Sequence, residues 1–159
     1  MADYTIRRMK IEDIPEIIGI QEIITKKKVA QQWRGALEHY IAKDPKTCLI
    51  AFVKHKMKDV IIGFVIGDIK IWGFGLRQSG WIEIIGIHPK HMGKGVGHAL
   101  GKRLLNYFNR MEVDGIYTVV RWDSGDLLSF FKSLGFDQSG FLNLEYKQKK
   151  KRWHTSTGT

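Results

Sequence analysis

The sequence predicts an α+β fold, an α/β sandwich in which helices flank a mixed β-sheet. Patterns typical of strands and helices follow one another in the order β-α-α-β-β-β-α-β-α-β. The run 80–87 is almost continuously apolar, as expected for a central strand that is covered on both faces. The length of 159 residues fits one domain, which we place at 1–146, followed by a basic tail at 147–159.

The first half of the chain combines helical spacing with β-branched runs. Ile14, Ile17 and Ile18 recur at helical spacing, and a second helical stretch stops before Asp44-Pro45, because the residue before proline is pushed out of helix. Two apolar runs around a polar turn then predict an antiparallel hairpin. The expected elements are a strand at 4–9, helices at 11–24 and 29–42, and the hairpin strands at 47–54 and 60–71.

The second half alternates strands and helices. Leu100, Leu104 and Phe108 lie on one face of an amphipathic helix, and Gly135 is a suitable C-cap for the next one. The expected elements are strands at 80–87, 115–122 and 141–146 and helices at 97–111 and 126–134, with 136–139 as an additional strand.

Composition limits the classes of function. The net charge of the whole chain is +10. Residues 1–146 carry only 21 Lys and Arg against 16 Asp and Glu, so the excess of positive charge within the domain is mild. A mildly positive electrostatic field attracts any polyanion and does not select among them. No nucleic-acid-binding motif accompanies the basic tail, which we expect to be a solvated chain end. No apolar run reaches the roughly 20 residues of a membrane span. The one cysteine, Cys48, excludes an internal disulfide and favours a cytoplasmic location, and no Cys/His cluster suggests a metal.

A glycine loop, His91-Met92-Gly93-Lys94-Gly95-Val96-Gly97, leads from the apolar strand into the amphipathic helix. The first N–H groups of a helix lack intrahelical partners, and the helix dipole adds positive potential there. Glycines let the backbone approach a phosphate closely. The loop therefore predicts a phosphate site, although glycines at this spacing also suit a tight turn with no ligand.

Two common phosphate motifs do not fit this loop. A P-loop requires Ser or Thr after Gly-Lys, whereas Gly97 is followed by His98. The dinucleotide pattern G-x-G-x-x-G also fails from either starting glycine, because its third position falls on His98 or Leu100.

The segment 85–97 (Ile-Gly-Ile-His-Pro-Lys-His-Met-Gly-Lys-Gly-Val-Gly) resembles the central motif of the GCN5-related N-acetyltransferase (GNAT) superfamily. The segment 130–136 (Phe-Phe-Lys-Ser-Leu-Gly-Phe) resembles its downstream motif, and the element order agrees over about residues 3–146. The resemblance implies a sheet that splays open, acetyl-CoA as the cosubstrate and an amine as the acceptor. It implies that the backbone of Ile85 and Ile87 meets the pantetheine arm. It further implies that the pyrophosphate is held by Gly93, Lys94, Gly95, Val96, Gly97 and His98, and that Ser124 stands where the family often has an Asn that contacts the cofactor.

The chain departs from the family pattern at positions that matter for proton transfer. Phe131 stands where the family usually has a tyrosine that protonates the departing thiolate. Val119 stands where the ribosomal-protein acetyltransferase branch has a catalytic glutamate, and Met92 replaces a usual Gln or Arg. A thiol of ordinary pKa near 8.5 is nevertheless a fair leaving group without a donor.

The acceptor amine must lose a proton, and Glu83 is the leading candidate base, since alternation would place it on one face with Ile85 and Ile87. It also fits a strand-end carboxylate paired with a lysine. Glu145 and His88 are alternatives, although His-Pro is common at a strand exit.

Trp72 and Phe74, in a glycine-aromatic loop, would line an acceptor pocket or pack on the sheet. The leading hypothesis is an N-acetyltransferase that acts on a protein N-terminus, a lysine or a small amine. A non-catalytic acyl-CoA-binding module or sensor is the alternative, suggested by Phe131. The sequence leaves open whether the chain forms a homodimer.

Overall fold

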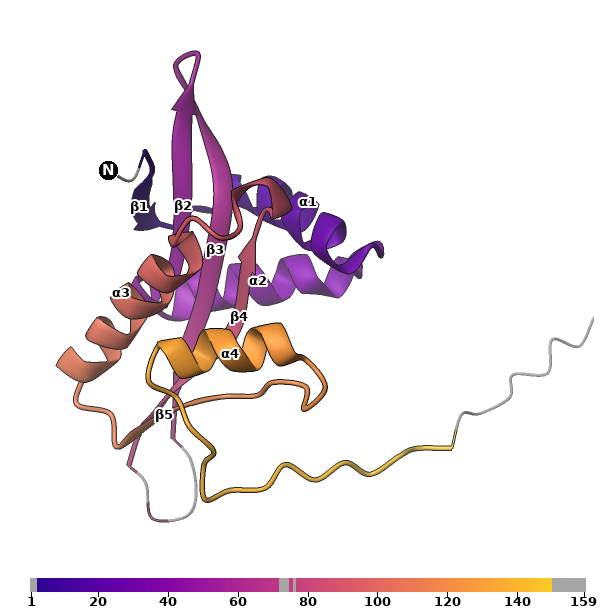
Figure 1. Ribbon diagram of the computed structural model, residues 1–159, viewed down its shortest axis with the longest axis vertical. Coiled ribbons are helices and arrows are strands. Elements are labelled where there is room, and N and C mark those ends of the chain that lie inside the picture. Colours follow the sequence, from indigo (N-terminus) through magenta and orange to yellow (C-terminus); the bar gives the residue numbers. More distant parts are fainter. Residues whose placement is uncertain (1–2, 72–74, 76, 150–159) are drawn as a thin grey trace, which may run out of the picture.

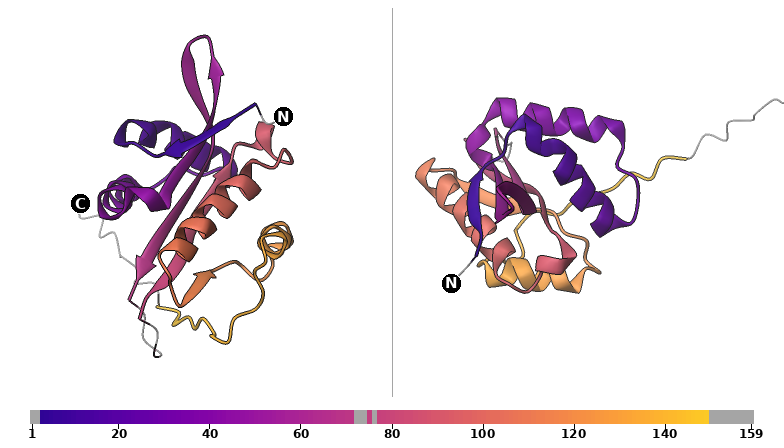
Figure 2. Two further views of the ribbon diagram at one scale, coloured as in Figure 1. Left: turned by 90° about the vertical axis from the view of Figure 1, so that its left-hand side faces the viewer. Right: turned by 90° about the horizontal axis from the view of Figure 1, so that it is seen from above.

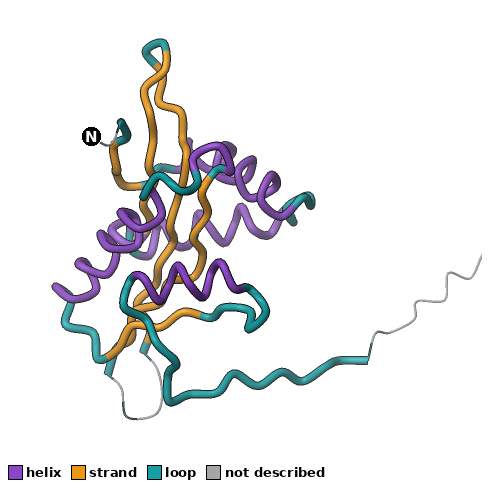
Figure 3. Tube along the Cα trace, viewed as in Figure 1, coloured by secondary structure: helices purple, strands orange, loops and turns teal. Residues whose placement is uncertain are grey.

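The computed structural model describes residues 3–71, 75 and 77–149. Strands and helices follow in the predicted order as far as the last helix, as Figures 1 and 3 show. The main elements are β1 (Thr5–Arg8), α1 (Ile14–Thr25), α2 (Gln31–Lys43), β2 (Cys48–His55), β3 (Lys58–Lys70), β4 (Ser79–Ile87), α3 (Val96–Arg110), β5 (Gly115–Thr118) and α4 (Gly125–Ser133). Three short 3-10 turns, η1 (Ile11–Asp13), η2 (Pro45–Thr47) and η3 (Pro89–His91), join them. None of the described helices is long and apolar enough to cross a membrane.

The described strands form one mixed sheet in the order β1-β2-β3-β4-β5. Neighbours are antiparallel from β1 to β4, which confirms the predicted hairpin, and β4 and β5 are parallel. Helices α1 and α2 cover one face and α3 and α4 lie on the other (Figure 2), so the predicted α+β sandwich is confirmed.

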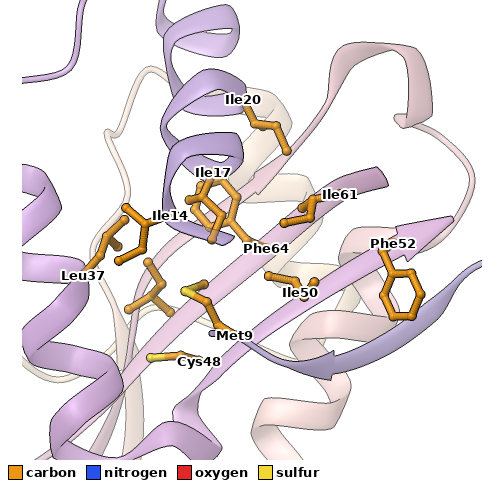
Figure 4. Close-up of a cluster of buried hydrophobic side chains, with 11 residues drawn as sticks. Met9, Ile14, Ile17, Ile20, Leu37, Cys48, Ile50, Phe52, Ile61 and Phe64 are labelled. Atoms are coloured by element: carbon orange, nitrogen blue, oxygen red, sulfur yellow. The ribbon is translucent and has the colours of Figure 1, made fainter. Parts of the chain in front are cut away.

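Two apolar clusters hold the layers together. Ile14 and Ile17 of α1 and Leu37 of α2 pack on Ile50 and Phe64 of the sheet, as Figure 4 shows. On the opposite face, α3 inserts a row of fully buried side chains that includes Leu100, Leu104 and Phe108. The two clusters fix α1 and α3 on opposite sides of the same central strands.

The ring of Phe108 packs against two glycines of the sheet and so brings α3 close to it. A Cβ atom added to Gly80 of β4 would lie 2.7 Å from the Phe108 ring, and one added to Gly67 of β3 would lie 3.0 Å from it. Glycine at these two positions therefore leaves the space that the ring fills, and the contact sets the distance between the last turn of α3 and the beginning of β4.

Phe108→Ala is expected to lower the free energy of unfolding by about 3–5 kcal/mol, because it removes a fully buried ring and leaves a cavity. Urea denaturation followed by circular dichroism measures the change. Phe108→Leu, which keeps most of the volume, should cost less than about 1.5 kcal/mol. Equal losses in the two variants would show that the cavity is not what destabilises Phe108→Ala and would contradict this account.

The C-terminal part corrects three predictions. β5 ends at Thr118, short of the predicted residue 122, and neither 136–139 nor 141–146 forms a strand. The pattern Phe-Leu-Asn-Leu-Glu-Tyr suits a strand, but a strand also requires hydrogen-bonding partners on a neighbouring edge. In the described chain this segment leaves the body of the protein and runs outward (Figure 1).

Candidate functional site

β4 and β5 separate part of the way along the sheet. Their pairing runs from Ser79 opposite Gly115 to Ile82 opposite Thr118 and stops there, whereas β4 continues to Ile87 beside β3. The hydroxyl of Thr118 donates to the carbonyl oxygen of Ile82 at 2.9 Å, at the point of separation. The last part of β4 therefore has one edge that no described strand covers, and the predicted splay is present.

The free edge offers the peptide groups of Ile85 and Ile87. The N–H of His88 donates to the carbonyl oxygen of Ile62 at 2.8 Å, so these two residues form a hydrogen-bonded pair across β3 and β4. Hydrogen-bonded and non-bonded pairs alternate in an antiparallel ladder. It follows that Ile85 and Ile87, opposite Val65 and Gly63, direct their N–H and C=O groups away from β3.

The glycine loop carries the backbone from β4 into α3. Gly93 and Gly95 have φ values of 75° and 81°, in the left-handed region that favours glycine. Gly95 is the N-cap, and the first bond within the helix runs from the N–H of Ala99 to the carbonyl oxygen of Gly95. The N–H groups at the start of the helix are left for an anion.

The start of α3 lies against α4. A Cβ atom added to Gly97 would lie 3.2 Å from Phe130 and 3.4 Å from Ile87, and one added to Gly101 would lie 2.7 Å from Leu134. Gly97 is therefore required for close packing rather than for a left-handed backbone, and α4 forms one wall beside the loop.

Positive charge gathers around the loop. Lys90, His91 and Lys94 lie within five positions of one another, and the imidazole rings of His88 and His91 are 5.9 Å apart. Burial, followed by the charge of Lys94, lowers the pKa of His91. The lysines therefore provide the permanent positive charge that an anion at this helix start would meet.

Glu83 lies at the point where β4 and β5 part, but on a different face from the one predicted. The register of β3 and β4 shifts there, since Ile66 pairs with Ile84 and Gly67 with Ile82, which leaves Glu83 as an extra residue. Ile82 and Ile85, three positions apart, consequently both pack on the α3 side, whereas Ile84 packs on the α1 side. The prediction that Glu83 shares a face with Ile85 and Ile87 is therefore wrong, because a one-residue bulge breaks the alternation.

The carboxylate of Glu83 has a lysine partner. Nζ of Lys70 forms an ion pair with the buried Oε1 of Glu83, without the alignment of a hydrogen bond, and lies 4.9 Å from the centre of the Trp81 ring. Burial, followed by the charge of Glu83, raises the pKa of Tyr40 in α2. A carboxylate, an ammonium group and aromatic rings thus meet on the α2 side.

Glu83 also borders a narrow cleft of about 170 Å³ between β4 and β5. Val119 and Phe131, at the two positions that depart from the family pattern, line the same cleft. Phe131 is buried and makes edge contacts with Phe130 and Phe136. The structure thus brings Glu83, Val119 and Phe131 together, and neither of the last two side chains carries a proton to transfer.

The remaining predicted residues lie elsewhere. Nδ1 of His88 accepts the N–H of Lys90 at 3.1 Å, a turn contact at the strand exit. Glu145 is exposed and borders a larger groove beyond β5, which shares Val119 and Phe131 with the narrow cleft but does not include Glu83. Ser124 is the N-cap of α4, and its hydroxyl makes no capping hydrogen bond. Trp72 and Phe74 lie outside the described residues.

Lys70 is the residue that sequence reasoning missed. The hairpin register holds the signal, because Lys70 pairs with Ser79 and is therefore a diagonal neighbour of Trp81. Its contact with Glu83 depends on the bulge, which the sequence pattern does not reveal. In the part of the chain that the structure describes, no group of three or more His, Cys, Asp or Glu side chains is placed to hold a metal ion.

Comparison with solved structures agrees with this geometry. The chain is similar to one in the NatC complex bound to Gag peptide and CoA, at 15% identity, with 87% of each chain covered and a TM-score of 0.74. It is similar to Chaetomium thermophilum Naa20 in complex with a bisubstrate analogue, at 21% identity, covering 82% of this chain and 69% of that one, with a TM-score of 0.71. The aminoglycoside acetyltransferase meta-AAC0020 from an uncultured soil metagenomic sample, in complex with sisomicin, matches at 13% identity, covering 92% and 97%, with a TM-score of 0.69.

These likenesses concern the fold, and the assignment to a family rests on the sequence itself. The family model described as the acetyltransferase (GNAT) family matches residues 14–136, which include the splayed strands, the glycine loop and α4. Acetyl-CoA as cosubstrate is consistent with that match and with the solved neighbours. The chain belongs to the acetyltransferase (GNAT) family.

Proposed function

We propose that this protein is an N-acetyltransferase that transfers the acetyl group of acetyl-CoA to a primary amine by direct attack. The observation that carries the proposal is a continuous polar track, from the free edge of β4 at Ile85 and Ile87 to the unpaired N–H groups at the start of α3. An extended peptide-like chain followed by a phosphate group matches that order of partners.

The donor would lie along this track. The peptide groups of Ile85 and Ile87 would pair with the amides of the pantetheine arm, as an added strand does. The loop from Gly93 to His98 would hold the pyrophosphate, with Lys94 as a nearby positive charge. Ser124 would be a further polar contact, since its hydroxyl makes no capping hydrogen bond.

The acceptor side is suggested by Lys70. Its ammonium group lies against Glu83 and over the Trp81 ring, so this pocket already accommodates a primary ammonium ion. We infer that the acceptor amine takes the place that Lys70 occupies here. A protein N-terminus, a lysine side chain and a small amine all satisfy that chemistry.

In the reaction, the amine nitrogen attacks the thioester carbonyl carbon and its excess proton passes to Glu83, directly or through one water molecule. The carbon–sulfur bond breaks, the amide is formed, and the thiolate of CoA leaves and takes a proton from solvent. Phe131 provides no proton, so the leaving group relies on the ordinary acidity of a thiol.

A second candidate is a non-catalytic acyl-CoA-binding module. Phe131 and Val119, both lining the cleft beside Glu83, favour it, because neither transfers a proton. Such a module would bind CoA along the free edge of β4 and the start of α3 without catalysing acetyl transfer.

One experiment separates the two candidates. The protein is incubated with acetyl-CoA and peptides with a free N-terminus, lysine peptides, polyamines or aminoglycosides, and free thiol is followed while calorimetry measures CoA binding. Acetylation of an amine supports the enzyme, and CoA binding with no turnover on any acceptor supports the module. Absence of CoA binding would contradict both.

We also propose a cytoplasmic location for this protein and a single catalytic domain. Burial raises the pKa of the Cys48 thiol to about 11, so this single cysteine is kept unreactive, which is compatible with a cytoplasmic protein. We place the limits of the catalytic domain at 1–146 and regard 147–159 as a basic tail.

A further inference from the structure

The narrow cleft between β4 and β5 is lined almost entirely by apolar side chains. It has a volume of about 170 Å³ and lies where the two strands part. Its two polar side chains are engaged, since the hydroxyl of Thr118 donates to the carbonyl oxygen of Ile82 and Glu83 is paired with Lys70. The apolar lining consists of Ile82, Ile84 and Ile85 of β4, Val119 and Val120 after β5, and Leu127 and Phe131 of α4.

The cleft continues from the free edge of β4. Ile85, whose peptide group would pair with the pantetheine arm, also lines the cleft, and the cleft closes at Ile82 and Thr118, where β4 and β5 pair. A thioester that follows the pantetheine arm would therefore direct its acyl chain into this space. The proposed place of the acceptor amine, at Lys70, is not part of the lining, so acyl chain and amine have separate places.

An acetyl group would leave much of the cleft empty. A carbon atom with its hydrogens takes up about as much room as a water molecule, roughly 30 Å³. On that scale an acetyl group needs roughly 60 Å³, a butyryl group roughly 120 Å³ and a hexanoyl group roughly 180 Å³. A butyryl group is therefore the longest of the three that the cleft of about 170 Å³ contains.

The two departures from the family pattern leave this space free of polar groups. Phe131 lacks the hydroxyl that a tyrosine would add, and Val119 is smaller than a glutamate and uncharged. Val119 and Leu127 are also 65% and 41% exposed, so the mouth of the cleft presents apolar surface to water. An acyl chain that covers this surface is stabilised by the hydrophobic effect.

We propose that this cleft makes butyryl-CoA a better donor ligand than acetyl-CoA, which it also admits. Each methylene group buried among apolar side chains raises affinity about fourfold, so two raise it about 15-fold. The reaction is unchanged: the amine nitrogen bonds to the acyl carbonyl carbon, the carbon–sulfur bond breaks, the excess proton passes to Glu83 and CoA leaves as the thiolate. This inference rests on the proposed placement of CoA along β4.

Calorimetry with the full-length protein tests the proposal without an acceptor, using CoA, acetyl-CoA, butyryl-CoA and hexanoyl-CoA. Butyryl-CoA is expected to bind about 15-fold more tightly than acetyl-CoA, and hexanoyl-CoA no more tightly than butyryl-CoA. Equal affinities for acetyl-CoA and butyryl-CoA would overturn the inference but leave the CoA site in place, and a further gain with hexanoyl-CoA would contradict the size of the cleft. Absence of binding by all four would contradict the placement of CoA itself.

Val119→Glu combined with Phe131→Tyr introduces a carboxylate and a hydroxyl into the cleft. The preference for butyryl-CoA should fall below about threefold, less than the gain from one methylene, while CoA itself binds as before. Val119 is exposed and tyrosine adds only a hydroxyl to Phe131, so the fold should persist, which thermal unfolding checks. Val60→Glu, the same change at an exposed position of β3 near the hairpin tip, is the matched control and should keep the full preference. A double variant that also keeps it would show that the acyl chain lies elsewhere and would overturn the proposal.

Discussion

Gly95→Asp is expected to abolish CoA binding while α3 stays folded. Gly95 is the N-cap of α3, and its φ of 81° places the new carboxylate beside the N–H groups that would hold the pyrophosphate. Two unit charges about 4 Å apart repel by about 4 kcal/mol near a protein surface. That repulsion corresponds to a loss of affinity of about 1,000-fold, which calorimetry with CoA measures.

Gly95→Asn is the matched control for the charge. Asn and Asp have almost the same size and tolerate the left-handed region similarly, so both variants carry the same backbone cost. A negative charge at a helix N-terminus stabilises the helix by about 0.3–1 kcal/mol, so thermal unfolding should favour Asp over Asn while CoA binding favours Asn over Asp. Equal CoA affinities in the two variants would show that no phosphate lies at this helix start.

The glycine loop illustrates what the sequence alone can predict. Strand, loop and helix follow directly in the chain, so the local pattern was enough to place Gly93 and Gly95 at a helix start, as the structure confirms. The periodic spacing of Ile14, Ile17, Leu100 and Leu104 likewise predicted which helix faces are buried. Features that depend on neighbouring residues in the chain were predictable.

Features that depend on distant segments were not. The face of Glu83 is set by a bulge between β3 and β4, and strict alternation placed it on the wrong side. The ion pair with Lys70 joins two strands, so it cannot be read from either alone. The segment 141–146 has a clear strand pattern, but whether it pairs is decided by an edge elsewhere.

Glu83→Gln is expected to lower kcat by about 100- to 10,000-fold, the usual contribution of a general base, with CoA affinity unchanged. The amide keeps the size of the carboxylate but no longer accepts the proton of the attacking amine. The change should therefore appear in turnover, and the dependence of kcat on pH should change with it. Steady-state kinetics over a range of pH, on the best acceptor of the amine panel, measures both.

Glu83→Gln also breaks the contact with Lys70, so the loss of a base must be separated from the loss of an ion pair. Lys70→Met breaks the same pair but keeps the carboxylate. If Lys70 holds the place of the acceptor, its removal should lower KM for the amine and leave kcat within a few-fold, because the incoming ammonium no longer competes with a resident one. If both variants lose turnover equally, the ion pair is structural and Glu83 is not the base. If only Glu83→Gln loses turnover, the carboxylate itself takes the proton, and the bulge in β4 is what turns it toward the acceptor.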